Sequence, residues 1–197
     1  MRILLIGASG TIGQAIATTL ATRHDLILAS KTKSAQRVDI ANPDSVRALF
    51  GRVGEVDAIV SAAGQAAFKP LDALTDGDFS LSLGNKLMGQ VNVVRFGLGS
   101  VNDGGSITLT SGILGQHPAP GTCAISLVNA GLEGFIRAAA LEAPRGIRVN
   151  IVSPPWVIET LKALGMPLAG GLPAATVAQA YARSVEGRET GTVISAA

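Results

Sequence analysis

The chain has 197 residues, of which 47% are apolar and 15% are charged, and its formal net charge is +2. This length is typical of one domain, and the apolar content supplies a core without any sign of disorder. The small charge, with no basic run or aromatic platform, argues against nucleic acid as a partner. The single Cys123 excludes an internal disulfide and a cysteine-based metal cluster. We therefore expect one domain over residues 1–197 and no metal site.

The apolar runs also bear on where the protein is found. No stretch approaches the roughly 18 apolar residues of a membrane span. The first apolar run, residues 3–6, is too short for the core of a secretory leader. We expect a cytoplasmic protein with no membrane partner.

Strand-like and helix-like segments alternate along the chain. The predicted strands are residues 3–6, 25–30, 37–40, 56–63, 105–111, 146–153 and 192–195. The predicted helices are residues 11–23, 42–53, 79–99, 122–142 and 174–186. Such alternation gives a mostly parallel sheet covered on both faces. The predicted fold class is α/β, a doubly wound domain of the Rossmann type.

Three glycines, Gly7, Gly10 and Gly13, follow the first strand and open the first helix. In this setting glycines permit a tight turn, bring backbone N–H groups close to a pyrophosphate, and seat the helix on the strand. The helix N-terminus adds unpaired donors and partial positive charge for the phosphates. The pattern predicts a dinucleotide site, and a tight turn without a ligand is the alternative.

The loop after the second strand carries cations and hydroxyls. An NAD site usually has an acid there for the ribose 2′-hydroxyl, but no Asp or Glu occurs between Leu26 and Val38. Ser30, Lys31 and Thr32 suit a 2′-phosphate instead. We therefore predict NADP, with NADPH preferred over NADH. A solvated polar loop is the alternative.

Several motifs occur in a fixed order along the chain. They are GASGTIG at 7–13, VDI at 38–40, SAAG at 61–64, LTSG at 109–112, NAGLEGF at 129–135 and RGIRVNIVSPPWVIET at 145–160. Together they resemble the short-chain dehydrogenase/reductase family over nearly the whole chain. The resemblance implies a Rossmann domain with oxidoreductase activity. Little sequence separates the second strand from Asp39, so one helix of the family is expected to be missing.

The resemblance also implies the cofactor contacts. Asp39 falls where the family has its adenine-contacting Asp, and Val157 falls at the contact to the nicotinamide carboxamide. The predicted cofactor residues are Gly7, Ser9, Gly10, Thr11, Ile12, Gly13, Ser30, Lys31, Thr32, Asp39, Ile40, Ala62, Ala63, Gly64, Pro154 and Val157.

The family's catalytic residues match only in part. Members use a Tyr as general acid/base, a Lys four residues later, a Ser on the preceding strand and an Asn on an earlier helix. Ser111 fits the Ser, whereas Ile125 and Asn129 fall at the Tyr and Lys positions. A hydrocarbon cannot transfer a proton, and general acid help is typically worth about 100- to 10,000-fold in rate.

Another donor is therefore needed for ordinary turnover. Counting back from Gly89, Lys86 falls in the slot that is usually Asn, with Asn85 adjacent. A lysine buried there would have a depressed pKa and act as an acid, or hold the ribose or the carbonyl. The alternative is a lysine that merely caps the pocket or points to solvent. The predicted catalytic residues are Ser111, Lys86 and Asn129.

Three other side chains are weighed against Lys86. His117, in a proline-flanked loop, is the alternative donor. Cys123 is interpreted as packing at a helix start. Tyr181, in the last helix, is interpreted as packing or as a dimer contact.

Two functions stay open. One is an NADP(H)-dependent oxidoreductase that acts on a small, apolar carbonyl or alcohol with a non-standard acid/base. The other is an NADP(H)-binding regulatory or redox-sensing protein without turnover. The helix over 122–142 is rich in Ala and Gly, so a partner helix can come close. The resemblance implies that it and the helix over 85–99 form a four-helix bundle across a homodimer or homotetramer, and a helix packed only on its own sheet is the alternative.

Overall fold

Seven parallel strands form one sheet, in the order β3-β2-β1-β4-β5-β6-β7, in the computed structural model, which describes residues 1–196. The strands are β1 (Arg2–Ile6), β2 (Asp25–Ser30), β3 (Gln36–Arg37), β4 (Val56–Ser61), β5 (Val101–Thr110), β6 (Arg148–Ser153) and β7 (Val193–Ser195). The strand order reverses between β1 and β4, which is the switch point where doubly wound sheets bind ligands. The predicted fold class is confirmed.

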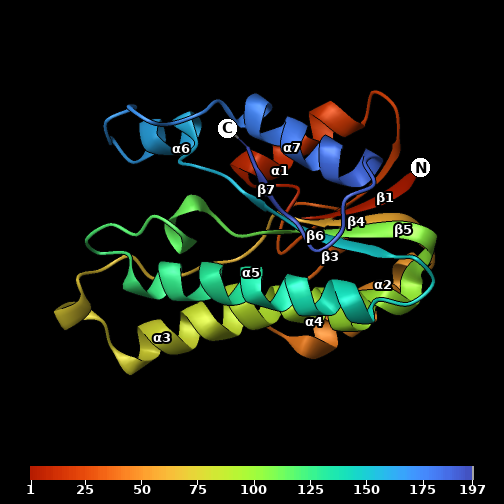
Figure 1. Ribbon diagram of the computed structural model, residues 1–197, viewed down its shortest axis with the longest axis horizontal. Helices are drawn as coiled ribbons and strands as arrows, with labels where there is room; N and C mark the ends of the chain where they lie inside the picture. The colour runs from red at the N-terminus through yellow and green to blue at the C-terminus, as the bar shows by residue number, and fades with distance from the viewer. Residues whose placement is uncertain (197) are drawn as a thin grey trace.

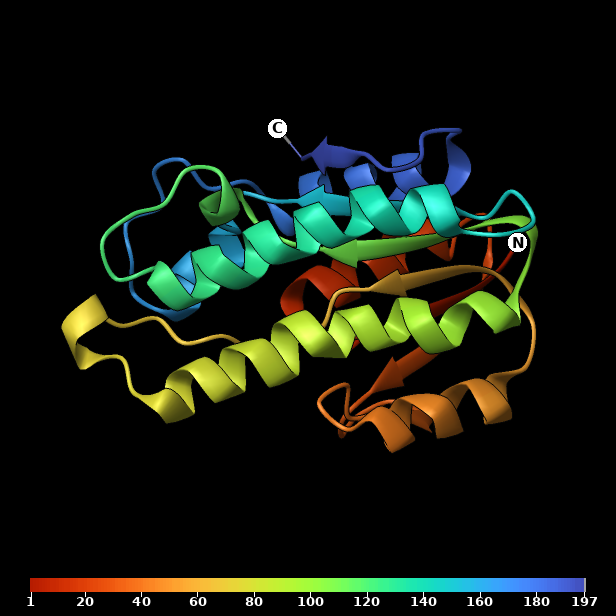
Figure 2. The same ribbon diagram turned by 60° about the horizontal axis from the view of Figure 1, so that its bottom comes forward.

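Helices cover both faces of this sheet (Figures 1 and 2). They are α1 (Thr11–Leu20), α2 (Pro43–Val53), α3 (Asp76–Ser82), α4 (Met88–Gly97), α5 (Cys123–Glu142), α6 (Ile158–Ala163) and α7 (Ala174–Glu186). Figure 1 shows α1 and α7 on one face, with α2, α4 and α5 on the other. Each face has its own buried cluster, one around Leu4 and Leu109 and one around Leu5 and Tyr181. Successive residues of β1 therefore belong to different clusters, because side chains along a strand point alternately to the two faces of the sheet.

The connection between β2 and β3 holds no helix, as expected. Residues 31–35 form a bent loop in which Ser30 Oγ accepts hydrogen bonds from the backbone N–H groups of Lys33 (3.0 Å) and Ser34 (2.8 Å). Parallel strands usually need a much longer crossover. The predicted strand over 37–40 is wrong beyond Arg37, because β3 ends at that residue. Residues 38–40 instead line a cavity.

The predicted helix over 79–99 is a composite. It begins at Asp76, because Thr75 and Asp78 form a reciprocal capping box. Residues Leu83–Leu87 then form a π-helical turn between α3 and α4. π-helical turns are rare in proteins overall, and many of those that occur are found at functional sites.

Other boundaries differ by a few residues from those predicted. The strand predicted over 56–63 ends at Ser61, and the helix predicted over 11–23 ends at Leu20. β5 begins at Val101, earlier than expected, whereas β6 begins at Arg148, later than expected. The short helix α6 was not predicted, because the loop it follows contains two prolines and few periodic residues.

α5 is the one described helix that is long and apolar enough to cross a membrane, with a mean hydropathy of 1.3 over its best window. Its inner face, including Val128, Leu132 and Ile136, is buried against the sheet. The expectation that no stretch approaches a membrane span is therefore wrong by length and composition, although buried core helices pass the same test. The predicted pairing of the outer faces of α4 and α5 with a second copy stays a prediction.

Candidate active site

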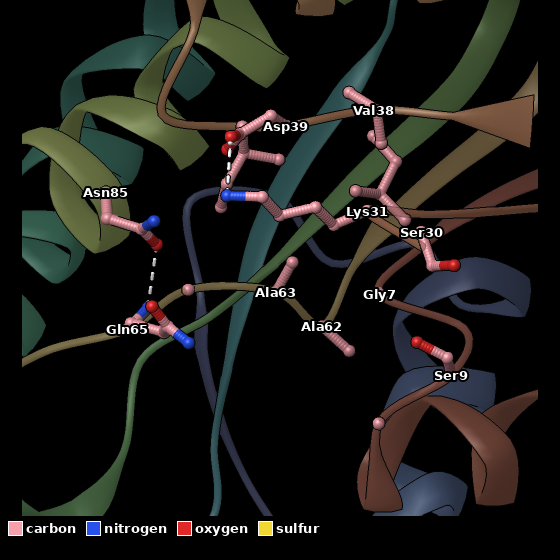
Figure 3. Close-up of a pocket in the computed structure, with 14 residues that line it drawn as sticks. Gly7, Ser9, Ser30, Lys31, Val38, Asp39, Ala62, Ala63, Gln65 and Asn85 are labelled. Atoms are coloured by element: carbon pink, nitrogen blue, oxygen red, sulfur yellow. Dashed lines mark hydrogen bonds and ion pairs between the residues drawn. The ribbon is translucent and has the colours of Figure 1, made fainter. Parts of the chain in front are cut away.

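A cavity of about 300 Å³ lies at the carboxyl ends of β1, β2 and β4 (Figure 3). It is lined by Ile6, Gly7, Ser9, Gly10, Ser30, Lys31, Val38, Asp39, Ile40, Ala62, Ala63, Gly64, Gln65 and Asn85. We call it the first cavity. Small residues and backbone form most of its floor, which suits a flat or extended ligand.

The three glycines of the first turn have different structural roles. Gly7 has a φ of +88°, and a Cβ there would lie 2.6 Å from Ala62 O. A Cβ on Gly13 would lie 2.0 Å from Gly7 O, so α1 packs directly on the turn. At Gly10 a Cβ would meet only Gly7 O, at an ordinary 3.5 Å. The fold therefore requires glycine at 7 and 13, while at Gly10 it leaves open space that borders the cavity.

Lys31 and Asp39 form an ion pair at the mouth of the first cavity, where Lys31 Nζ lies 2.7 Å from Asp39 Oδ2 (Figure 3). The hydrogen bond from Lys31 is the main cause that lowers the pKa of Asp39. Asp39 Oδ1 also accepts from the N–H of Ala41. The Lys31 side chain is 68% exposed, and exposed pairs contribute little to stability. Its ammonium is therefore free to change partner at small cost.

A second cavity of about 220 Å³ adjoins the first, and the two share Gly64. It lies beyond the carboxyl ends of β5 and β6. Its walls are mostly apolar, and Phe68 and Trp156 pack together with ring centroids 5.7 Å apart. Its polar lining consists of Lys86, Ser111, Asn129 and Thr160. Two joined cavities, one polar and one apolar, suit a ligand with two chemically different ends.

Lys86 comes from the π-helical turn and is buried, with 9% of its surface exposed. Its chain packs over Gly64, where a Cβ would lie 2.9 Å from Lys86 Cγ. The ammonium donates one hydrogen bond, 3.3 Å long, to Ser111 O. Burial lowers the pKa of Lys86 to about 8. The side chain thus lies in the cavity, as predicted, rather than in solvent.

Ser111 is held by a residue that the sequence did not single out. Its Oγ donates to Glu133 Oε1 over 3.0 Å, and Gln116 Nε2 donates to Glu133 Oε2 over 2.8 Å. Glu133 is 3% exposed. It lies on α5 one turn after Asn129, on the face that also carries Ile125. That helical spacing from the predicted site is the signal that would have found it.

Asn129 lines the second cavity with an unused acceptor. Its Nδ2 donates to Gly112 O over 3.3 Å, whereas its buried Oδ1 has no hydrogen-bond partner in the part of the chain that the structure describes. Buried polar atoms are seldom left unpaired, so this oxygen is suited to a ligand donor. Ile125 lines the same cavity and presents only hydrocarbon.

Known proteins share this architecture. The family model described as enoyl-(acyl carrier protein) reductase matches residues 15–196. Carbonyl reductase family member 4 of Danio rerio is 30% identical over 173 residues, which cover 77% of this chain and 73% of that protein. The chain belongs to the short-chain dehydrogenase/reductase family.

Further comparisons agree with this assignment. Hydroxynaphthalene reductase of Aspergillus fumigatus is 29% identical, and the match spans 78% of this chain but only 65% of that protein. The crystal structure of protein lin1944 from Listeria innocua has a TM-score of 0.95 and 42% identity, and covers 99% of this chain and 98% of that one. A small-chain dehydrogenase solved in complex with NADPH has a TM-score of 0.87 and 25% identity, covering 99% of this chain and 95% of that one.

Most of the predicted short-chain dehydrogenase/reductase site residues border one of the two cavities. The first is lined by Ser9, Ser30, Ile40, Ala62 and Ala63, along with Gly7, Gly10, Gly64, Lys31 and Asp39. Ile12, Pro154 and Val157 line the second, as do all three predicted catalytic residues. Thr11, Gly13 and Thr32 line neither of them.

The alternative donors lie elsewhere in this short-chain dehydrogenase/reductase chain. Tyr181 is fully buried under the sheet, where its hydroxyl lies 2.7 Å from Thr110 Oγ1. His117 borders a separate small cavity near β7. Cys123 is exposed, so its interpretation as a packing residue was wrong. Among residues 1–196, no three His, Cys, Asp or Glu side chains gather as metal ligands.

Proposed function

We propose that this chain is an NADP(H)-dependent oxidoreductase that acts on a small carbonyl or alcohol without the family's usual Tyr. NADPH, when bound, supplies a hydride equivalent to a carbonyl carbon. The residues present fit such a ligand on two counts. Gly10 leaves open space beside the N-terminus of α1, which no side chain caps. Asn129 Oδ1 is a buried acceptor that lacks a partner.

The first cavity would hold the nucleotide end. Backbone N–H groups at the start of α1 would bind the pyrophosphate. Lys31 would leave Asp39 for the 2′-phosphate, because a phosphate offers it more charge and more acceptors than one carboxylate. Asp39 would then be free to accept from the adenine amino group. The hydroxyl of Ser30 is already an acceptor within its own loop, which orients it for donation to the phosphate.

The second cavity would hold the nicotinamide end and the substrate. Asn129 Oδ1 would accept from a ribose hydroxyl. Lys86 Nζ would donate to the substrate oxygen and supply its proton. An acid with a pKa near the working pH is the best placed to do so, and the pKa of Lys86 is about 8. The position of this ammonium in the apolar cavity is the observation that carries the proposal.

The second candidate is an NADP(H)-binding protein without turnover. Ile125 favours it, because a hydrocarbon lines the cavity where the resemblance expects a phenol. The two candidates make different predictions about Lys86, since only an oxidoreductase needs its proton.

The test is NADPH binding and oxidation by the purified protein. We expect bound NADPH to show enhanced fluorescence and NADH to bind more weakly. Lys31→Ala should weaken NADPH binding about tenfold and leave NADH unchanged, because only NADPH has the 2′-phosphate. The exposed Lys162, on α6, gives the matched control Lys162→Ala. Equal affinity for both nucleotides would contradict the NADP assignment.

Turnover is then measured with a panel of aldehydes, ketones and quinones. NADPH oxidation that depends on substrate and is lost in Lys86→Met supports the oxidoreductase. Tight binding without oxidation across the panel supports the second candidate. If neither nucleotide binds, both candidates are wrong.

A further inference from the structure

The second cavity contains a buried ammonium, that of Lys86, which forms no ion pair within residues 1–196. An ammonium has three N–H groups, and among residues 1–196 the only partner of these groups is Ser111 O. Burying a charge in this way is costly unless the charge is paired.

Two acids on the helices next to the π-helical turn have other partners. Glu133 lies behind Ser111, and its two oxygens accept from Ser111 and Gln116. Asp78, on α3, is paired with Lys69. The pKa of Lys86 is lowered by burial alone. Residues 1–196 therefore offer this ammonium no counter-ion, and a bound anion could supply one.

The cofactor's charged groups fit the other cavity. Its phosphates belong beside Gly10 and Lys31, which line the first cavity and not the second. Lys86 lines only the second. The nicotinamide carboxamide and its ribose are neutral donors and acceptors, so they leave the ammonium uncompensated.

The rest of the second cavity is apolar and small. Ile12, Ile125 and Val157 form its inner walls, and the exposed ring of Phe68 lies against Trp156. A volume of about 220 Å³ lies below the roughly 300–1,000 Å³ typical of drug-sized ligands. The lining therefore suits a single ring or a short hydrocarbon.

We propose that the second cavity binds a small apolar acid, whose anionic oxygen pairs with Lys86 Nζ and whose hydrocarbon body lies against the apolar walls. This inference rests on the proposed function and names its substrate class. The substrate's carbonyl or hydroxyl would then be carried on a molecule that also bears a carboxylate, or would itself be an acidic enol or phenol.

Trp156 gives a direct readout, because it is the only tryptophan in the chain and lines the cavity. The probes are 3-phenylpropionate and its neutral amide, titrated at pH 7 with and without saturating NADP⁺. We expect the acid to bind about 10- to 100-fold more tightly than the amide, the range for a hydrogen bond to a charged group. Equal quenching by the two probes would overturn the inference.

Two further experiments, one with variants and one at several pH values, test whether Lys86 causes the preference for the acid over the amide. Lys86→Met should abolish the difference between acid and amide, whereas Lys162→Met on exposed α6 should keep it. In the wild-type protein, affinity for the acid should fall as pH rises past about 8, since the carboxylate stays ionised while Lys86 loses its proton. Because this pH series uses only the wild-type protein, its result does not depend on whether a variant folds. A flat series, or an acid preference that survives in Lys86→Met, would contradict the assignment.

Separate measurement of NADPH binding distinguishes the two proposals. If NADPH binds and the acid does not, the inference fails and the proposed function stands. If the acid binds through Lys86 and NADPH does not bind, the proposed function fails and the second cavity is an acid site of another kind.

Discussion

The hydroxyl of Ser111 donates its hydrogen to Glu133 Oε1 over 3.0 Å. In this bond the hydroxyl is the donor and the carboxyl oxygen is the acceptor. Ser111 Oγ then presents lone pairs, not a hydrogen, to the second cavity. Toward a ligand this serine is an acceptor, and the donor beside it is the ammonium of Lys86.

The Ser111–Glu133 pair should show strong coupling in stability. Ser111→Ala leaves a buried carboxylate oxygen without its donor, which should lower the free energy of unfolding by about 1–3 kcal/mol. Once Glu133→Gln has removed the charge, the same Ser111→Ala change should cost less. Urea unfolding of the two single variants and the double variant measures this coupling. Glu142→Gln, at the exposed end of the same helix, is the control. Additive effects would show that the bond contributes little.

Lys86 should make stability depend on pH. Its pKa is about 8 in the folded protein, against an ordinary value of 10.5, so burial of the ammonium costs roughly 3 kcal/mol at pH 7. Between these two values the unfolded chain binds a proton that the folded protein has lost, so stability rises with pH across this window. Lys86→Met should therefore be more stable than wild type at pH 7, with a gain that vanishes towards pH 10.5. Urea unfolding at several pH values measures it, and a constant difference would contradict it.

Substitutions at Gly10 and Gly13 should affect different properties of the protein, cofactor binding at Gly10 and folding at Gly13. Gly13→Ala places a Cβ 2.0 Å from Gly7 O and should strongly destabilise the protein. Gly10→Ala meets no close atom, so the melting temperature should stay near that of wild type. Its methyl group would nevertheless occupy the space where a pyrophosphate approaches the backbone, and NADPH affinity should fall at least tenfold. Normal NADPH binding by Gly10→Ala would count against the site as described.

Tyr181 should stay protonated well above its ordinary pKa. Burial raises the pKa of its phenol, with an opposing contribution from the hydrogen bond to Thr110. Because the unfolded chain ionises near pH 10 and the folded one does not, stability falls as pH rises above that value. As the only tyrosine in the chain, it gives an unambiguous phenolate absorbance, which should appear only on unfolding. Tyr181→Phe should cost about 1 kcal/mol and leave NADPH binding unchanged.

The sheet could be predicted from the sequence because most of its strands contain a short apolar run and alternate with helix-like segments. β2 was predicted to the residue, and so was α7, whose periodic face is fully buried. The π-helical turn could not be predicted, since nothing in Leu83–Leu87 differs locally from an α-helix. It depends on tertiary contacts that the sequence does not display. The start of α3 at Asp76 does have a sequence signal, the capping box of Thr75 and Asp78.

The site was predictable where a motif or a spacing marks it. Lys86 was located by counting from Gly89, and the structure has it in the cavity. The link between Ser111 and Glu133 joins β5 to α5 across 22 residues, and only the fold brings these side chains together. The ion pair between Lys31 and Asp39 likewise could not be predicted, because it depends on the path of the loop after β2.

The π-helical turn lies between two anchored points. On one side, Ser82 Oγ accepts from the N–H of Ala67 over 2.9 Å. On the other, the Gln90 amide forms two hydrogen bonds with the backbone of Thr110, of 2.7 and 2.8 Å. If the same residues formed a regular α-helix, the segment after the turn would be rotated about the helix axis by about 100° from its present orientation relative to the segment before it. The extra residue in the turn lets both anchors hold at once, so shortening this segment by one residue would release the loop after β4 or the end of β5, and with it the wall that the two cavities share.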